Sequence, residues 1–276
     1  MIPLATVVFA GNSKKNNPWA KVKQPKRGAP QAIGGYSAGC VIGGMELPVR
    51  GVGYQVARPA RQRHFGHPLL IATVKDLAAH VKSSGHGVLF VGDLGQPRGG
   101  PAPSGHSSHQ TGLDADIWFW HPKAAERAPM SASRTAKLDA PSMVSVKAKR
   151  KTKYWSAKVP AVLEKAASDS RVARIFINPV IKNELCKAAT PADTPWMRKL
   201  RPWWGHNAHF HVRLECPSGS PDCKKQDPIP AGNGCKEIAW WLDEKAQAER
   251  KKKRKKYRKS VRGLPTLPAA CGPVLK

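Results

Sequence analysis

The chain has 276 residues and a mass of 30.0 kDa, which suits one large domain or two small ones, and 41% of its residues are apolar. That apolar fraction, with 25 prolines and 24 glycines, predicts a loop-rich globular protein and excludes wholesale disorder and collagen. The net charge of +29 predicts an anionic partner or anionic surroundings, and no apolar run is long enough to span a bilayer.

The N-terminus resembles a secretory signal only in part. Residues 2–10 form a short apolar stretch that ends in Ala10-Gly11, but the positive charge that usually precedes such a stretch is missing. We therefore interpret residues 1–17 as a signal-peptide remnant or a disordered N-terminus. Residues 18–44 are rich in Gly, Pro and Ser and are expected to form a loop that wraps the domain.

Short strands and helices are predicted to follow in alternation. The apolar pattern predicts a strand at residues 54–56, a helix over residues 69–82 and a buried strand at residues 88–92. The prolines and glycines of residues 93–105 predict an exposed loop. The segment that follows, from residue 113 to residue 120, alternates as a strand does.

The second half of the chain begins with a polar, basic stretch over residues 122–153. Beyond it the pattern predicts a helix near 159–168, a strand at 174–177, a helix over 180–187 and a strand at 208–214. These elements predict an α+β fold: a single domain with a central antiparallel sheet, flanking helices and long disulfide-tied loops. We expect the domain to span residues 18–242 and residues 243–276 to form a basic tail.

The six cysteines are even in number and spread over most of the chain, so they allow 15 disulfide pairings. Cys216 and Cys223 flank a turn-prone loop that one disulfide would close, while the other pairings stay open. The short gaps of a cysteine-based zinc site are missing. Disulfides therefore predict an oxidising compartment, periplasmic or extracellular.

Basic residues concentrate in two clusters, with five of seven residues in Lys147–Lys153 and nine of ten in Arg250–Lys259. Each cluster can be a solvated loop or tail, or a surface that binds anionic wall polymers or membrane faces. Nucleic acid would satisfy the same charge, but no base-reading motif accompanies it, so we expect no specific nucleic-acid partner.

Five of the ten histidines lie in two short windows of the sequence. In the first, a histidine-bearing loop precedes a strand that projects Asp114 and Asp116 from one face. In the second, His209, His211 and Arg213 share one strand face. Two neighbouring antiparallel strands would aim these imidazoles and carboxylates at one point.

That arrangement favours a zinc site on the sheet, with His109, Asp116 and His211 as ligands and water in the fourth position. Each piece alone has a simpler explanation, because His-x2-His is often a capping pair and Asp114 can pair with Arg213. The conjunction of two windows favours the metal, and zinc held without thiolates is typically catalytic.

The spacing His109-x6-Asp116, followed far downstream by His209-x-His211, resembles the paired motifs of the lysostaphin, D-Ala-D-Ala metallopeptidase and hedgehog-like zinc peptidases. More narrowly, the chain resembles the penicillin-insensitive murein endopeptidases. The stretches that carry this resemblance are Gly34–Cys40, Phe65–Pro68, Gly105–Asp116, Arg174–Pro179 and Arg201–His211. The similarity extends from about Pro18 to Cys271.

The resemblance implies a periplasmic enzyme that cuts the D-alanyl–diaminopimelyl amide of peptidoglycan cross-links. Zn²⁺ would bind His109, Asp116 and His211, and His106 would be a ligand for extra metal. His209 and His206 would act beside the zinc as acid/base and transition-state groups. The resemblance also implies the disulfides Cys40–Cys271, Cys186–Cys235 and Cys216–Cys223, the first of which would tie the basic tail back to the domain.

For this chemistry we expect His209 to act as the base and His206 to orient it or donate to the oxyanion. Asp114 would steady a ligand imidazole or serve a purely structural role. One alternative is a zinc D,D-carboxypeptidase of the same fold, and another is a non-enzymatic cationic protein that binds the cell wall. The sequence leaves open whether the protein forms a homodimer.

Overall fold

The computed structural model describes residues 17–104, 107–260 and 263–276, except for the side chains of residues 254–260. Its strands are β1 (Gln31–Gly35), β2 (Ala38–Ile42), β3 (Met45–Glu46), β4 (Arg50–Gly51), β5 (Tyr54–Val56), β6 (Phe65–Gly66), β7 (Leu89–Val91), β8 (Asp114–Trp118), β9 (Val144–Ser145), β10 (Arg150–Lys151), β11 (Val172–Ile177), β12 (Leu200–Pro202) and β13 (His209–Leu214). Its α-helices are α1 (Pro68–Ser83), α2 (Lys123–Arg127), α3 (Ala132–Ala136), α4 (Lys158–Ser168), α5 (Pro179–Cys186), α6 (Thr194–Lys199), α7 (Ile238–Leu242), α8 (Glu244–Ser260) and α9 (Cys271–Leu275). Within these ranges, no helix is both long enough and apolar enough to cross a bilayer.

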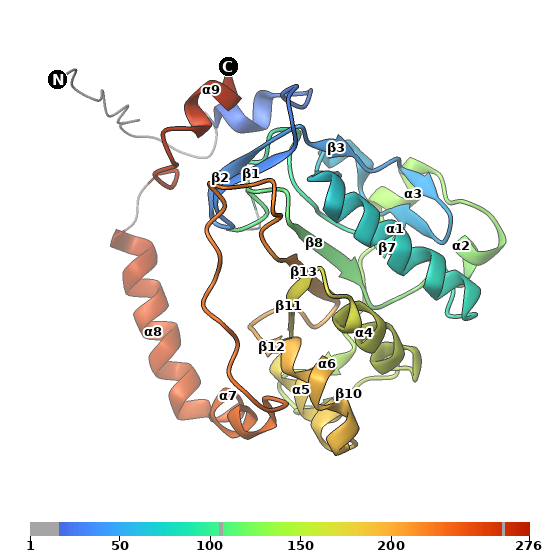
Figure 1. Ribbon diagram of the computed structural model, residues 1–276. Coiled ribbons are helices and arrows are strands. Elements are labelled where there is room, and N and C mark those ends of the chain that lie inside the picture. Colours follow the sequence, from blue (N-terminus) through green and yellow to red (C-terminus); the bar gives the residue numbers. More distant parts are fainter. Residues whose placement is uncertain (1–16, 105–106, 261–262) are drawn as a thin grey trace.

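One α+β domain is built on a seven-stranded sheet with the order β12-β11-β13-β8-β7-β5-β4 (Figure 1). Its central strands are antiparallel, as predicted, but β11 pairs with β12 and β5 with β7 in parallel. The expectation of an antiparallel sheet is therefore wrong for these two pairs of strands, whereas the edge strand β4 pairs antiparallel with β5. The reason is that helices connect these parallel pairs, α1 between β5 and β7 and α5 and α6 between β11 and β12.

Helices α1 and α4 cover one face of this sheet (Figure 1). The helix predicted over residues 69–82 is confirmed as α1, which begins where the His67 ring accepts a hydrogen bond from the Leu69 N–H and Pro68 takes the first helical position. Buried apolar residues recur along α1 at helical spacing and pack against Ile117 and Val212 of the sheet. The hydrophobic core therefore lies between this face and the two helices.

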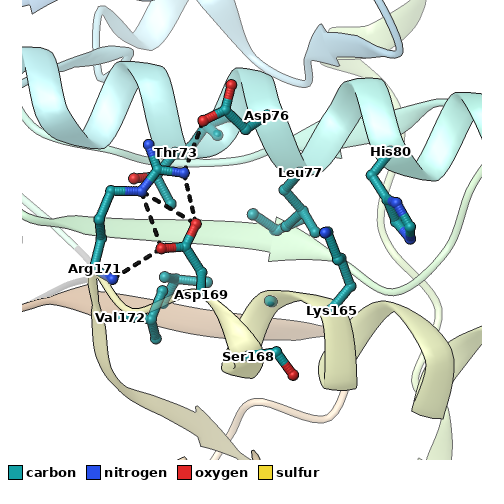
Figure 2. A pocket seen from close by; sticks show the side chains of 13 residues that line it. Thr73, Asp76, Leu77, His80, Lys165, Ser168, Asp169, Arg171 and Val172 are labelled. Atoms are coloured by element: carbon teal, nitrogen blue, oxygen red, sulfur yellow. Dashed lines mark hydrogen bonds and ion pairs between the residues drawn. The ribbon is translucent and has the colours of Figure 1, made fainter.

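A cavity of about 330 Å³ opens between α1 and α4 on the core side of the sheet (Figure 2). Arg171 crosses its rim and forms ion pairs with Asp76 on α1 and with Asp169 at the end of α4. Ile117 and Val212 form part of its lining. These two side chains point away from the predicted ligands, so the cavity lies behind the candidate site.

The segment predicted as a wrapping loop, residues 18–44, contains a β-hairpin. Strands β1 and β2 pair antiparallel around a turn at Tyr36-Ser37. The prediction failed because glycines at Gly34, Gly35 and Gly39 obscure the strand alternation. Backbone packs closely against Gly39, where an added Cβ would lie 2.3 Å from the Ile33 carbonyl oxygen.

Residues 93–105 were expected to form an exposed loop, and this expectation is also wrong, because most of the described part is buried. Its polar groups are satisfied internally: the side-chain amide of Gln96 donates to the carbonyls of Gly99 and Pro101 at 3.0 Å each. Composition identified a loop, but burial depends on whether the loop can pair its own backbone groups.

The three disulfides implied by the family resemblance are confirmed: Cys40–Cys271, Cys186–Cys235 and Cys216–Cys223. The first ties α9 to β2, so the C-terminal segment returns to the hairpin (Figure 1). In the sequence between β13 and Cys271, the basic run lies on α8, a helix that was not predicted.

Candidate metal centre

The two central strands bring the two histidine windows together. In the β8–β13 pair, His211 lies opposite Asp116 and Arg213 lies opposite Asp114. Because side chains alternate along a strand, all four project from the same face, while Ala115 and its neighbours face the core. The prediction that two antiparallel strands aim imidazoles and carboxylates at one point is confirmed.

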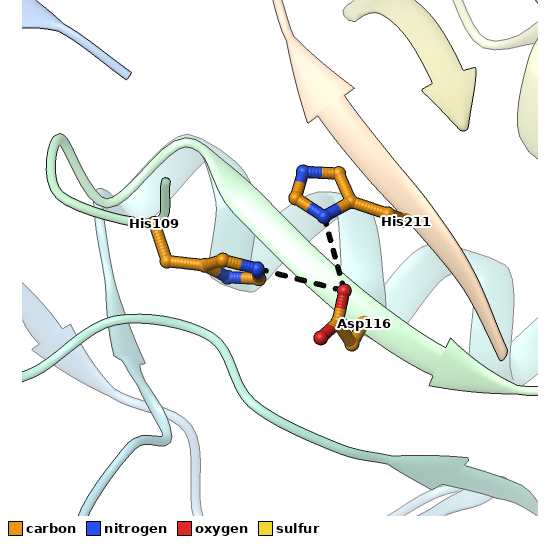
Figure 3. A group of neighbouring side chains, drawn as sticks. All are labelled: His109, Asp116 and His211. Atoms are coloured by element: carbon orange, nitrogen blue, oxygen red, sulfur yellow. Dashed lines mark ion pairs between the residues drawn. The ribbon is translucent and has the colours of Figure 1, made fainter. Parts of the chain in front are cut away.

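Three buried side chains meet on this face (Figure 3). His109, Asp116 and His211 each present one ligand atom, and these atoms lie within 4.8 Å of one another. The Oδ1 atom of Asp116 is 3.5 Å from His109 Nε2 and 3.1 Å from His211 Nδ1. Two imidazoles and one carboxylate form a donor set that suits a zinc ion with an open fourth position.

Asp114 organises this group without belonging to it. Its Oδ2 atom accepts a 2.9 Å hydrogen bond from the backbone N–H of His109, whose φ of 69° lies in the left-handed region. Its Oδ1 atom lies 3.1 Å from His211 Nε2, and Arg213 binds both carboxylate oxygens, at 2.7 and 3.1 Å. One buried carboxylate thus sets the backbone of one ligand and the ring orientation of another.

The electrostatics of the two carboxylates follow from these contacts. Burial alone would raise the pKa of Asp114, but the charges and hydrogen bonds of Arg213 and His211 outweigh it and hold that pKa far below its ordinary value. Burial is likewise outweighed at Asp116, where His209 and His109 lower the pKa. Both groups are therefore ionised at neutral pH, which is the form that binds a cation.

The ligand His211 experiences the opposite balance of the same effects. Burial would lower its pKa, but Asp114 and Asp116 outweigh burial and raise it. A metal ion binds only the neutral imidazole, so protons compete with the metal at this ring. In the neutral ring, the Nε2 atom that contacts Asp114 carries the proton. The lone pair of the ring is then on Nδ1, which lies on the side of Asp116.

His209 and His206 border the three ligands. The Nε2 atom of His209 lies 3.7 Å from Asp116 Oδ1, and its side chain is partly exposed. The His206 ring packs 5.1 Å from that of His209 and 5.8 Å from that of His211. The predicted acid/base pair is therefore next to the ligands, with His209 on the side that solvent reaches.

A hydrogen bond restricts what His206 can do. Its Nδ1 atom lies 2.9 Å from the carbonyl oxygen of Trp204, which only accepts, so Nδ1 carries the proton. Burial, together with the nearby His209 and His211, lowers the pKa of His206 to about 3. The neutral ring then keeps a lone pair on Nε2. This tautomer suits a residue that accepts a hydrogen bond and does not suit the predicted donor to an oxyanion.

The loop that carries His206 is held by Asn178, a contact that the sequence did not predict. Asn178 donates through its backbone N–H to the His206 carbonyl at 3.0 Å and through its side-chain amide to the Gly205 carbonyl at 2.7 Å. Its Oδ1 atom accepts from Val180 N–H and so begins α5. The available signal was the stretch Arg174–Pro179, which carries part of the family resemblance but does not by itself indicate a contact with the loop of His206.

Positive charge beside His109 was also not predicted. Arg61 and Arg63 both bind the Oδ2 atom of the buried Asp93, at 3.1 and 2.9 Å. One small pocket is lined by Arg63, Asp93 and His109, and the side chain of Arg61 is partly exposed.

The remaining predicted ligand, His106, lies outside the described residues.

Comparison with known proteins identifies the family of the chain. A family model described as penicillin-insensitive murein endopeptidase matches residues 32–276. The chain belongs to this family. It is 41% identical over 245 residues to the penicillin-insensitive murein endopeptidase of Klebsiella pneumoniae strain 342, covering 88% of each chain. It is 43% identical over 227 residues to that of Yersinia enterocolitica, covering 82% of this chain and 81% of the relative.

The protein is thus a murein endopeptidase, a peptidase that acts on peptidoglycan. Family membership therefore decides against the alternative of a non-enzymatic wall-binding protein. Among the residues that the structure describes, His109, Asp116 and His211 are the group that can hold a metal ion. Two members of this donor set lie on the central strands β8 and β13, and His109 lies in the loop that precedes β8.

Proposed function

We propose that this murein endopeptidase is a zinc enzyme that hydrolyses the D-alanyl–diaminopimelyl amide of peptidoglycan cross-links with an activated water. The observation that carries the proposal is the convergence of His109, Asp116 and His211 from a loop and two strands, with ligand atoms within 4.8 Å of one another. A bound Zn²⁺ would polarise the amide carbonyl and lower the pKa of the attacking water.

In this proposal His109 and His211 bind the zinc through ring nitrogens and Asp116 through a carboxylate oxygen. The contact of His211 Nε2 with Asp114 supports Nδ1 as the ligand atom of that ring. Such outer carboxylates fix the tautomer of a ligand and make the ring a stronger donor. His106 remains our proposed ligand for extra metal.

The proton transfers are assigned to His209. Its ring borders Asp116 and is partly exposed, so it can take the proton of the attacking water and deliver it to the leaving amine. His206 would orient His209 and the water, because its Nδ1–H is committed to the Trp204 carbonyl and its Nε2 can only accept. No acyl-enzyme forms in this scheme, which accounts for indifference to β-lactams that acylate serine.

We further propose that the enzyme works in the periplasm, where its disulfides persist and its substrate lies. The net charge of +29 would hold it against anionic wall polymers or membrane faces. Binding to sacculi should then weaken steeply with added salt. Salt-insensitive binding would count against this role of the charge.

The decisive experiment digests purified sacculi with and without a chelator and identifies the released muropeptides by mass. Loss of cross-linked dimers, with new tetrapeptide monomers and chelator sensitivity, is the expected result. Release of D-alanine alone, from uncross-linked pentapeptides, would instead identify the carboxypeptidase alternative. Cleavage that survives complete metal removal would overturn the proposal.

Variants separate metal binding from proton transfer. His211→Ala and Asp116→Ala should lose both the bound zinc, measured by elemental mass spectrometry, and the cleavage of sacculi. His209→Ala should keep most of the zinc and lose about 10²- to 10⁴-fold in rate, the typical contribution of a general base. His80→Ala, the same change on α1 outside the ligand group, is the matched control. Full activity in a metal-free His211→Ala protein would refute the ligand assignment.

A further inference from the structure

Four tryptophans form a cluster beside the metal centre, Trp203, Trp204, Trp240 and Trp241, which we call the tryptophan cluster. The rings of Trp204 and Trp241 are 4.4 Å apart, and Trp203 and Trp240 pack against Trp241 at 6.1 and 5.2 Å. Trp203 and Trp240 remain 43% and 47% exposed. Large exposed aromatic surface that is held in a fixed arrangement typically marks a binding site.

Helix α8 holds the cluster in place from one side. The guanidinium of Arg250 lies 3.3 Å from the ring centroid of Trp204 and 5.2 Å from those of Trp203 and Trp241. Gln247 accepts a 2.6 Å hydrogen bond from the indole N–H of Trp204. Arg250 also lies 5.8 Å from the ring centroid of Trp240. These contacts fix the cluster, so the exposed parts of Trp203 and Trp240 are preorganised for a ligand.

One aromatic ring separates the cluster from the predicted zinc ligands. The ring of Phe176, on β11, packs edge-on against Trp203 at 5.8 Å. The same ring also lies 5.4 Å from the ring of His211 and 6.3 Å from that of His206. A polymer cleaved at the metal centre would therefore pass over or close to the tryptophan cluster.

We propose that Trp203 and Trp240 form a stacking platform for the glycan strand of murein, an inference that rests on the proposed cleavage of its peptide cross-links. Murein combines pyranose rings with peptide stems. The D-alanyl–diaminopimelyl link carries methyl and charged groups and no ring, so it has no flat surface to place on an indole. A pyranose ring presents an apolar face of C–H groups, which matches an exposed indole face.

The test uses two substrates that differ only in the sugar. One is a cross-linked muropeptide dimer that keeps its disaccharides, and the other is the same dimer after an amidase has removed them. Trp203→Ala and Trp240→Ala should each raise KM for the disaccharide-bearing dimer about tenfold, equivalent to about 1.4 kcal/mol. Neither variant should change kcat/KM for the sugar-free dimer by more than about twofold.

Val52→Ala is the matched control, because Val52 is 67% exposed and lies in the β4–β5 turn, at the opposite edge of the sheet from β12 and Trp203. Equal losses on both substrates would overturn the platform and indicate that the tryptophans only support Phe176. Trp240 makes this distinction sharper, because it packs on Trp241, and the rings of both Trp241 and Trp203 lie between it and Phe176.

Direct binding separates failure of the platform from failure of the proposed function. Peptide-free glycan strands, prepared with the amidase, should quench the tryptophan fluorescence of the wild-type protein and bind Trp240→Ala at least tenfold more weakly. This measurement requires no cleavage, so it decides the platform even if the enzyme cuts neither dimer. Equal binding of glycan strands by the wild type and both variants would refute the platform, whatever the cleavage assay gives.

Discussion

The two faces of the β8–β13 ladder have opposite chemistry, although the same two strands build both. One face presents Ile117, Phe210 and Val212 to the core beneath α1 and α4. The other presents Asp116 and His211, with their ligand atoms about 3 Å apart. The first face stabilises the fold by removing apolar surface from water, and the second concentrates ionised groups in a buried position.

The contrast shows how the protein tolerates a costly site. Buried charges destabilise a fold unless each has a partner. On the polar face Asp114 forms an ion pair with Arg213, and the guanidinium of Arg213 also lies 4.1 Å from the ring centroid of Tyr36. These contacts offset the cost of burying the two charges. The apolar face needs no such pairing. The apolar face therefore contributes stability alone, whereas the polar face carries the predicted ligands and must also pair its own buried charges, and this difference can be tested.

The largest expected effect is that of Asp114→Asn. The substitution leaves the buried Arg213 without its counter-ion, which typically costs about 3–5 kcal/mol. It also removes the carboxylate that orients His211, so zinc affinity should fall about 10- to 100-fold. Urea denaturation measures the first effect, and zinc titration against a competing chelator measures the second.

A double variant, Asp114→Asn/Arg213→Met, separates these two effects. It removes both members of the pair, so much of the lost stability should return while zinc affinity stays low. If Asp114→Asn bound zinc as tightly as the wild type, Asp114 would be purely structural, the alternative that the sequence analysis left open.

A smaller effect, on stability alone, is expected for Ile117→Ala on the apolar face. The side chain is buried next to Asp116 in sequence but points into the core, so truncation should cost about 2–4 kcal/mol. Zinc affinity, measured at a temperature where the variant is folded, should stay within about threefold of the wild type. A loss of affinity as large as that of Asp114→Asn would show that the two faces are not independent.

The part of the site predictable from sequence is the part that rests on strand periodicity. Alternation along residues 114–118 and 209–214 requires Asp116 and His211 to share a face once the strands pair. The helices α1, α4 and α5 were predictable for a similar reason, because their apolar residues recur at helical spacing.

What could not be predicted depends on contacts between distant segments. The hydrogen bonds from Asn178 to the loop of His206 are formed across 27 and 28 positions, and no local pattern specifies them. The tryptophan cluster joins residues 203–204 to residues 240–241 and to Arg250, which the sequence shows only as a member of a basic run. The two parallel strand pairs, β11–β12 and β5–β7, likewise follow from helix crossovers rather than from strand composition.

The smallest expected effect concerns a buried charge on neither face of the ladder, Lys182 of α5. Its ammonium donates to the carbonyls of Met197 and Asn233 at 2.7 and 2.6 Å. Burial, reinforced by Arg201 and opposed by Glu237, lowers its pKa from 10.5 to about 7. Asp114 has an ionic partner that keeps it charged, whereas Lys182 relies on neutral carbonyls, so the two residues should respond differently to pH.

The direction of the response follows from proton uptake. Between pH 7 and pH 10.5 the unfolded chain binds a proton at Lys182 that the folded chain has released, so stability rises with pH in this window. Relative to Lys182→Met, the wild type should gain about 2 kcal/mol of unfolding free energy between pH 7 and pH 9. Lys75→Met, on an exposed position of α1, is the control that should leave this pH dependence unchanged. If the wild type and Lys182→Met followed parallel pH profiles, Lys182 would stay charged in the fold, and its two carbonyl partners would be enough to hold a buried cation.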